Sequence, residues 1–276
     1  MSQGPSLEAV DLSAGYDQHR ILNGVSLSLM PGRITSIVGG NASGKSTLLR
    51  TLARILVPKA GQVLLDGKPI HEIRSREVAK TVGLLPQSPI APEGITVRDL
   101  VSRGRHPHQG LFSTWTARDE AAVTEALHAT SMIELRDREI DTLSGGQRQR
   151  AWIAMALAQE TGMLLLDEPT TFLDVAHQID VLDILVDLNR SRGTTIVMVL
   201  HDLNLAARYS DRLIAVSGGG IHADGTPADV LTEANVRAVF GLDNRIVIDP
   251  VSGSPTMIPI GRHGCGRVGC ATPVNS

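Results

Sequence analysis

Residues 39–47 constrain this chain more than any other segment. They read Gly-Gly-Asn-Ala-Ser-Gly-Lys-Ser-Thr and directly follow the apolar run of residues 34–38. When a strand leads into such a loop and then into a helix, backbone N–H groups and the positive end of the helix dipole converge and bind phosphate. Lys45 can then bridge the β- and γ-phosphates of a nucleoside triphosphate, and the Ser46 hydroxyl can ligate Mg²⁺. The segment therefore predicts a nucleotide site, with an ordinary Gly-rich turn as the alternative.

A second segment has the same potential to bind an anion. Residues 143–147 read Leu-Ser-Gly-Gly-Gln and lead into residues 151–158, which are rich in alanine. Ser144 can cap a helix here, and Gly145 and Gly146 allow an anion to approach the backbone closely. One nucleotide does not need two such sites in one chain. The segment is either a second phosphate-binding helix terminus or a capped helix and nothing more.

Two carboxylates follow a predicted buried strand, residues 163–166, which read Met-Leu-Leu-Leu. Asp167 and Glu168 would stand at the C-terminal edge of that strand, where ligands bind in open α/β sheets. The other polar or aromatic residues of interest, in chain order, are Tyr16, Gln87, Asp174 and His201. Together with the two Gly-rich segments, these residues resemble the ATP-binding subunit of ABC transporters over about residues 6–250.

The resemblance implies an α/β fold with a RecA-like phosphate-loop core and an antiparallel β layer. A helical subdomain at about residues 88–160 is inserted in the ATPase domain of residues 6–250, and residues 251–276 form a partly flexible C-terminal tail. The resemblance also implies that ATP is hydrolysed with Mg²⁺ at a site shared by two copies of the chain, which face head to tail.

The resemblance further assigns the site residues. ATP contacts Gly39, Gly40, Asn41, Ala42, Ser43, Gly44, Lys45, Ser46, Thr47, Ser144, Gly145, Gly146, Gln147 and Asp174, and adenine stacks on Tyr16. Mg²⁺ is bound by Ser46, Gln87 and Asp167. Glu168 is the general base and His201 the switch histidine, while Gln87 also touches the attacking water and reports to the membrane partner. Residues 143–147 correspond to the family's signature motif.

Each isolated residue has an alternative reading. Tyr16 could be a half-buried aromatic, and Gln87, between Pro86 and Pro89, could be a turn residue. His201 could cap a helix or be a satisfied core histidine. Asp174 could cap the helix predicted at residues 175–190, and this role is compatible with the functional one.

The phosphate loop departs from the commonest family form at two positions. Gly40 replaces a usual proline, and Ala42 replaces a usual glycine. If residue 42 needed a positive φ, alanine would cost about 1 kcal/mol and slightly weaken nucleotide binding. Alanine is familiar at this position in the branch that imports ferric siderophores, so we expect a dihedral that alanine tolerates.

Composition limits location and partners. The longest apolar runs fall short of the 18–20 residues that span a bilayer, and the N-terminal residues lack a basic segment followed by an apolar one. We therefore expect a peripheral protein at the cytoplasmic face of the membrane. The formal net charge of −3 argues against a general nucleic-acid binder. Both cysteines, Cys265 and Cys270, lie in the Gly-rich tail, where a flexible reduced segment is favoured over a metal site.

The pattern of apolar residues predicts the elements around these motifs. Parallel strands are expected at residues 34–38, 82–85, 163–166 and 195–200, and antiparallel strands within residues 6–33 and 62–70. Helices are expected at residues 97–103, 117–130 and 233–240, with a short helix after Thr226 and a terminal hairpin from residues 246–249 and 257–260.

The branch of the family follows from three stretches, residues 103–108, 170–178 and 201–209. They are similar to ATPases of iron-siderophore, haem and cobalamin importers, with the ferric-siderophore systems as the main reading. The implied partners are permease subunits and an extracytoplasmic binding protein that acts through them. His106 and His108 either lie near the permease contact or are simply solvated. The alternative class is a soluble ABC-type ATPase acting on the ribosome or DNA, which would carry a second cassette or a long coiled coil.

Overall fold

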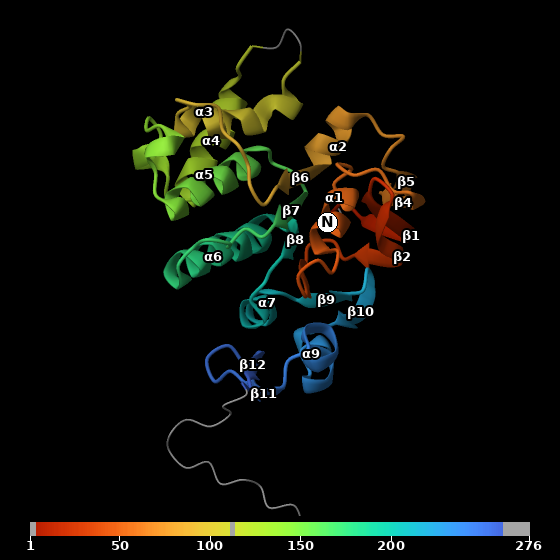
Figure 1. Ribbon diagram of the computed structural model, residues 1–276. Coiled ribbons are helices and arrows are strands. Elements are labelled where there is room, and N and C mark those ends of the chain that lie inside the picture. The colour runs from red at the N-terminus through yellow and green to blue at the C-terminus, as the bar shows by residue number, and fades with distance from the viewer. Residues whose placement is uncertain (1–3, 111–113, 262–276) are drawn as a thin grey trace, which may run out of the picture.

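The computed structural model describes residues 4–110 and 114–261. A six-stranded sheet with the order β10-β9-β3-β8-β7-β6 forms its centre (Figure 1). The four predicted parallel strands are confirmed as β3 (Ile34–Gly39), β6 (Val82–Leu85), β7 (Met163–Asp167) and β8 (Thr195–Val199). β3, β7 and β8 are buried throughout, because both faces of the sheet are covered. We did not predict β9 (Arg212–Ser217), which is parallel to β3, or the edge strand β10 (Gly220–Gly225).

A second, four-stranded sheet confirms the predicted antiparallel layer. Its order is β2-β1-β4-β5, from β1 (Leu7–Tyr16), β2 (His19–Leu29), β4 (Ala60–Leu65) and β5 (Lys68–Pro69). Asp66 and Gly67 turn the chain between β4 and β5 with φ of 51° and 75°, as a two-residue hairpin requires. Helix α1 (Lys45–Leu52) buries Leu48, Leu49 and Leu52 in the core that this layer shares with the central sheet.

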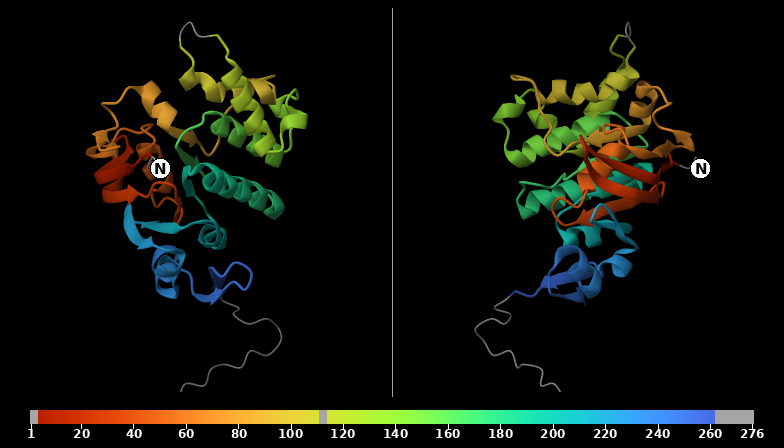
Figure 2. Two further views of the ribbon diagram at one scale, coloured as in Figure 1. Left: turned by 180° about the vertical axis from the view of Figure 1, so that it is seen from behind. Right: turned by 45° about the vertical axis from the view of Figure 1, so that its right-hand side comes forward.

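Four helical segments between β6 and β7 pack against one another on the other side of the central strands (Figures 1 and 2). They are α3 (Val97–Ser102), η1 (Arg103–His108), α4 (Ala117–Ala129) and α5 (Gly145–Ala158). Thr96, Thr116 and Ser144 cap α3, α4 and α5 with their side chains. Two shorter turns, η2 (Ile133–Leu135) and η3 (Ile140–Thr142), lie between α4 and α5, and α2 (Ser75–Thr81) precedes β6.

The remaining helices and strands come after β7 in the chain. They are α6 (Val175–Arg192), α7 (Leu203–Tyr209), α8 (Pro227–Val230), α9 (Glu233–Phe240) and a hairpin of β11 (Asn244–Ile248) and β12 (Pro255–Pro259). The expected helices and terminal hairpin are thus confirmed. Across residues 4–110 and 114–261, the helices are too short or too polar to cross a membrane. Cys265 and Cys270 lie outside the described residues.

Candidate functional site

The phosphate loop joins β3 to α1 and has the geometry of a phosphate cradle. A Cβ atom on Gly39 would lie 2.3 Å from the Val216 carbonyl oxygen, so only glycine fits there. Lys45 is buried, and its Nζ donates to the carbonyl oxygens of Gly39 at 3.0 Å and Gly40 at 2.9 Å. Burial lowers the pKa of Lys45, and the charges of Glu168 and Asp167 oppose that shift. A cation is therefore fixed over the loop.

Ala42 adopts a φ of 59°, in the left-handed region. Our expectation of a dihedral that alanine tolerates is therefore wrong. The Cβ atom of a non-glycine residue crowds the backbone in this region, at a cost of about 1 kcal/mol relative to glycine. The loop keeps this strain within a segment whose neighbours Ser43 and Lys45 are buried.

Asp167 closes the cradle from the end of β7. Its Oδ1 accepts a hydrogen bond from the Ser46 hydroxyl at 2.8 Å. Its Oδ2 is buried and accepts no hydrogen bond from the described residues, and Arg50 Nη2 is 3.6 Å away. Burial raises the pKa of Asp167, although the hydrogen bond from Ser46 and the charge of Arg50 oppose this. A hydroxyl beside a carboxylate with one unsatisfied oxygen fits a Mg²⁺ ion.

Glu168, the next residue, is contacted by two side chains from distant parts of the chain and by one from the following turn. Gln87 Nε2 donates to Glu168 Oε2 at 2.5 Å, and His201 Nε2 lies 2.6 Å from Oε1. Thr171 Oγ1 also donates to Oε2, at 3.1 Å, a contact that our sequence analysis missed. Glu168 has a φ of 56°, and such strain persists only where surrounding contacts hold it. The three predicted catalytic side chains therefore meet at one carboxylate.

Tyr16 lies at the end of β1, and its hydroxyl accepts a hydrogen bond from Arg50 Nη1 at 3.1 Å. Arg50 belongs to α1, the helix that begins in the phosphate loop, and also faces Asp167. Tyr16 is 41% exposed, which agrees both with the predicted adenine platform and with the half-buried aromatic given as its alternative. One arginine thus connects the predicted adenine platform with the carboxylate of the predicted Mg²⁺ site.

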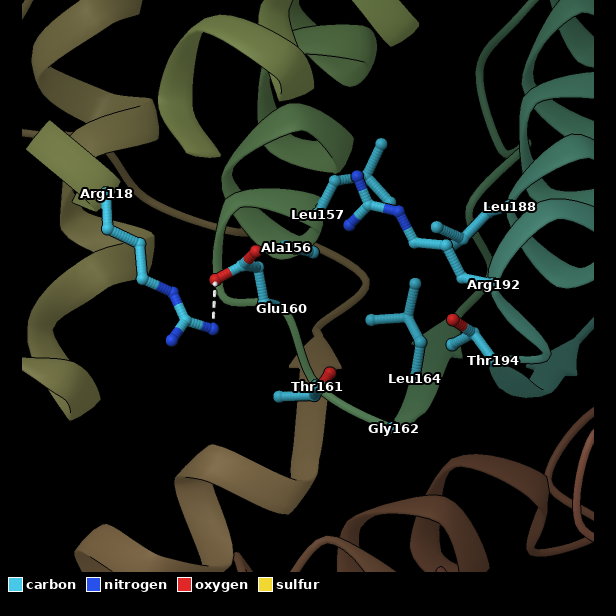
Figure 3. Close-up of a pocket in the computed structure, with 10 residues that line it drawn as sticks. All are labelled: Arg118, Ala156, Leu157, Glu160, Thr161, Gly162, Leu164, Leu188, Arg192 and Thr194. Atoms are coloured by element: carbon cyan, nitrogen blue, oxygen red, sulfur yellow. Dashed lines mark ion pairs between the residues drawn. The ribbon is translucent and has the colours of Figure 1, made fainter. Parts of the chain in front are cut away.

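A cavity of about 300 Å³ opens over the loop and is lined by Ile21, Asn41, Ala42, Ser43, Gly44, Lys45, Ser46, Thr47, Glu168 and His201. Within the described residues, that lining includes neither the signature segment, residues 144–147, nor Asp174. A second cavity, of about 310 Å³, lies between α4, α5 and α6 (Figure 3). Arg118 and Glu160 form an ion pair of 3.5 Å at its edge, and its lining shares no residue with the first cavity.

The signature segment and the Asp174 loop cap helices and also face outward. Ser144 and Gln147 form a reciprocal capping box on α5, and Asp174 caps α6, so both predicted helix caps are confirmed. A Cβ atom on Gly145 would meet no atom of the described chain within 4 Å beyond its own turn. Phe172, two residues before Asp174, is 92% exposed with a φ of 64°. These surfaces lack a counterpart among the described residues.

The segment of residues 103–108 contains a buried network that our sequence analysis missed. The Arg105 side chain is only 2% exposed and contacts Asp119 Oδ1 at 2.9 Å, Glu160 Oε2 at 2.8 Å and the Ala158 carbonyl oxygen at 2.7 Å. His108 Nε2 lies 2.8 Å from the Gln159 carbonyl oxygen, so His108 is not simply solvated, whereas His106 is exposed. Among the described residues, no group of three or more His, Cys, Asp or Glu could hold a metal.

Comparison with known proteins gives the family. The ABC transporter family model matches residues 22–171, which is more than half of the chain. The chain belongs to the ABC transporter family. It is an ATPase with the ABC cassette fold.

The ABC ATPase is similar to two curated relatives over nearly their whole lengths. It is 50% identical to the ferric enterobactin transport ATP-binding protein FepC of Escherichia coli (strain K12), over 93% of this chain and 94% of FepC. It is 52% identical to the achromobactin transport ATP-binding protein CbrD of Dickeya dadantii (strain 3937), over 92% and 94%. Its fold matches a chain of an inward-facing ABC transporter, assigned to the metal-chelate type, with a TM-score of 0.81, 29% identity and 94% and 99% coverage.

Proposed function

We propose that this ABC ATPase powers the import of ferric siderophores and works as a head-to-tail dimer. Each ATP would lie between the phosphate loop of one copy and residues 144–147 of the other. The open surface at Gly145 and the exposed ring of Phe172 support a partner at this face, because a hydrophobic side chain in a strained, exposed loop is best explained by a contact. In this arrangement residues 88–160 act as a helical subdomain within residues 6–250, and residues 251–276 as the C-terminal tail.

The reaction is hydrolysis of the γ-phosphate. Glu168 would orient a water molecule and take its proton as the water oxygen attacks the γ-phosphorus and the bond to ADP breaks. His201, 2.6 Å from Glu168 Oε1, would hold the carboxylate and face the developing charge. Ser46, Gln87 and Asp167 would hold Mg²⁺, which supplies charge neutralisation on the phosphates. Tyr16 would stack on adenine, and Lys45, with the loop amides, would bind the phosphates.

The cargo assignment is carried by one observation: the chain aligns over almost its full length with relatives named for transport of ferric enterobactin and achromobactin. The chain would act at the cytoplasmic face of the membrane with permease subunits, and an extracytoplasmic binding protein would deliver the chelate. Gln87 links Glu168 to the surface beside the helical segments, so it would report the state of the nucleotide to the permease.

Uptake of a labelled ferric chelate tests this function. A strain without this chain should lose ATP-driven uptake under iron limitation and regain it with the wild-type chain. Gln87→Ala should still bind ATP and assemble with the permease but lose most transport, because the contact to Glu168 is removed. Normal iron uptake with lost haem or cobalamin uptake would overturn the cargo assignment. Normal uptake of all three would remove the chain from these importers and favour a soluble ATPase.

A further inference from the structure

His177 connects the two outward-facing segments within one chain. It lies on the first turn of α6, three residues after Asp174, and its backbone N–H donates to Asp174 Oδ1 at 2.9 Å. Its ring Nδ1 lies 2.7 Å from the same oxygen. A carboxylate oxygen only accepts, so this contact places the proton on Nδ1 and fixes the plane of the ring.

The other edge of that ring rests on the signature segment. A Cβ atom on Gly146 would lie 2.6 Å from Cδ2, 2.9 Å from Cγ and 3.1 Å from Nε2 of His177. Glycine is therefore required at residue 146 for the ring to lie where it does, whereas residue 145 has open space around it. The two glycines of the signature segment therefore have different surroundings. Gly145 has open space in which an anion could approach, whereas Gly146 lies against the His177 ring.

We propose that His177 is a positioning residue that holds the signature segment and the Asp174 loop as one surface. Gly146 lies in the first turn of α5 and Asp174 is the N-cap of α6, and these two helices are separated in the chain by β7 (Figure 1). The ring joins them through a hydrogen bond at one edge and van der Waals contact at the other. Under the proposed function, on which this inference rests, both segments must meet the partner copy together, so fixing them in advance favours closure on ATP.

Two substitutions separate this role from general support of the fold. His177→Ala removes both contacts. His177→Asn keeps an N–H donor at nearly the position of Nδ1 and part of the planar group against Gly146. Asp180→Ala, at an exposed position on the same helix, is the matched control for a truncation on α6. The chain used is full-length, in a Glu168→Gln background that retains ATP.

Hydrogen exchange of a peptide covering residues 144–150, without nucleotide, tests the contact itself. It should become about tenfold faster in His177→Ala, and remain near the reference rate in His177→Asn and Asp180→Ala. ATP-dependent dimerisation should weaken about tenfold in His177→Ala and recover in His177→Asn, with ATP binding by the monomer unchanged.

Hydrogen exchange and ATP-dependent dimerisation distinguish failure of this inference from failure of the proposed function. Unchanged exchange in His177→Ala overturns the inference, and so does equal weakening of dimerisation by Asn and Ala or loss of monomer ATP binding in His177→Ala. Faster exchange in a chain that never dimerises with ATP, in any variant, would contradict the proposed function and leave the contact between His177 and Gly146 established.

Discussion

The two surfaces predicted to bind nucleotide differ in how much of a site each one forms. The phosphate loop is enclosed: Lys45, Asp167 and Glu168 are buried, and each has side-chain or backbone partners from the same chain. The signature segment and Asp174 loop are open, with Phe172 fully outward. Because one of the two surfaces is enclosed by its own chain and the other faces solvent, the described residues of a single chain do not form a complete two-sided site. Under the proposed function, this difference would explain why two segments predicted to bind phosphate occur in one sequence.

The largest expected effect lies in the enclosed half. Glu168→Gln removes the proton acceptor but keeps an oxygen that can accept from Gln87 or Thr171. ATP turnover should fall by about 10²–10⁴-fold, while ATP binding persists and dimers accumulate. Steady-state phosphate release and equilibrium nucleotide binding measure the two quantities. Thr171→Val, which removes only one hydrogen bond to the same carboxylate, is the control and should lose far less. Near-normal turnover in Glu168→Gln would exclude Glu168 as the base.

The next effect compares the two halves directly. Gly145→Asp would set a carboxylate against the γ-phosphate held by the other copy, at a cost of about 4 kcal/mol for charges about 4 Å apart near a protein surface. Its monomer should bind ATP normally but fail to dimerise, since space around Gly145 leaves the fold undisturbed. Lys45→Ala should do the opposite and weaken ATP binding by the monomer itself. Calorimetry of monomers and sedimentation with ATP separate the outcomes. If Gly145→Asp abolished monomer binding, the shared-site arrangement would be wrong.

The sequence predicted the enclosed half better than the open half. Strand-loop-helix order places Lys45, and parallel strands end at one edge, so the meeting of Gln87, Glu168 and His201 followed from motif order. The side-chain contacts to Thr171 and Arg50 depend on rotamers that motif order does not specify. The φ of Ala42 was misjudged because the expectation rested on alanine being familiar at this position in the siderophore branch, whereas the fold imposes a left-handed dihedral.

The open half depends on contacts between segments that no local pattern connects. His177 and Gly146 are 31 positions apart by their numbers (177 − 146), on two helices, and the sequence signal for their contact was only a second glycine. The sequence placed Arg105 in a branch-specific stretch but did not indicate that its side chain is buried, since arginine is rarely buried unless paired. β9 and β10 were not predicted, although residues 213–216 of β9 form a continuous buried apolar run.

The third-largest expected effect concerns the Arg105 network, which supports the helix that begins in the signature segment. Arg105 ties η1 to Asp119 of α4 and to Ala158 and Glu160 at the end of α5, the helix that begins in the signature. Arg105→Ala leaves a buried carboxylate without its partner and should lower the free energy of unfolding by about 3 kcal/mol. Arg118→Ala is the matched control. Its guanidinium is exposed and 3.5 Å from the same Glu160, so the change should be within about 0.5 kcal/mol. Equal effects of the two substitutions in urea unfolding would contradict the network.

The smallest expected effect is the pH dependence of that network. Burial raises the pKa of Asp119, but hydrogen bonds from Thr116 and Arg105 outweigh it and lower the value to about 2, from 3.8. A carboxyl whose pKa is lower in the folded state stabilises the fold above its unfolded pKa, and this stability is lost as the pH falls through the folded value.

The shift corresponds to about 2 kcal/mol of unfolding free energy, which is present above about pH 5 and disappears toward pH 2. Asp119→Asn keeps an acceptor for the cap of α4 but cannot ionise. The gap in unfolding free energy between wild type and Asp119→Asn should therefore be largest at pH 6–7 and close as the solution is acidified. Urea unfolding at a series of pH values measures it. A gap that stayed constant with pH would mean that Asp119 acts through shape and not through its charge, and the hold on α5 would then rest on Glu160 and the Ala158 carbonyl alone.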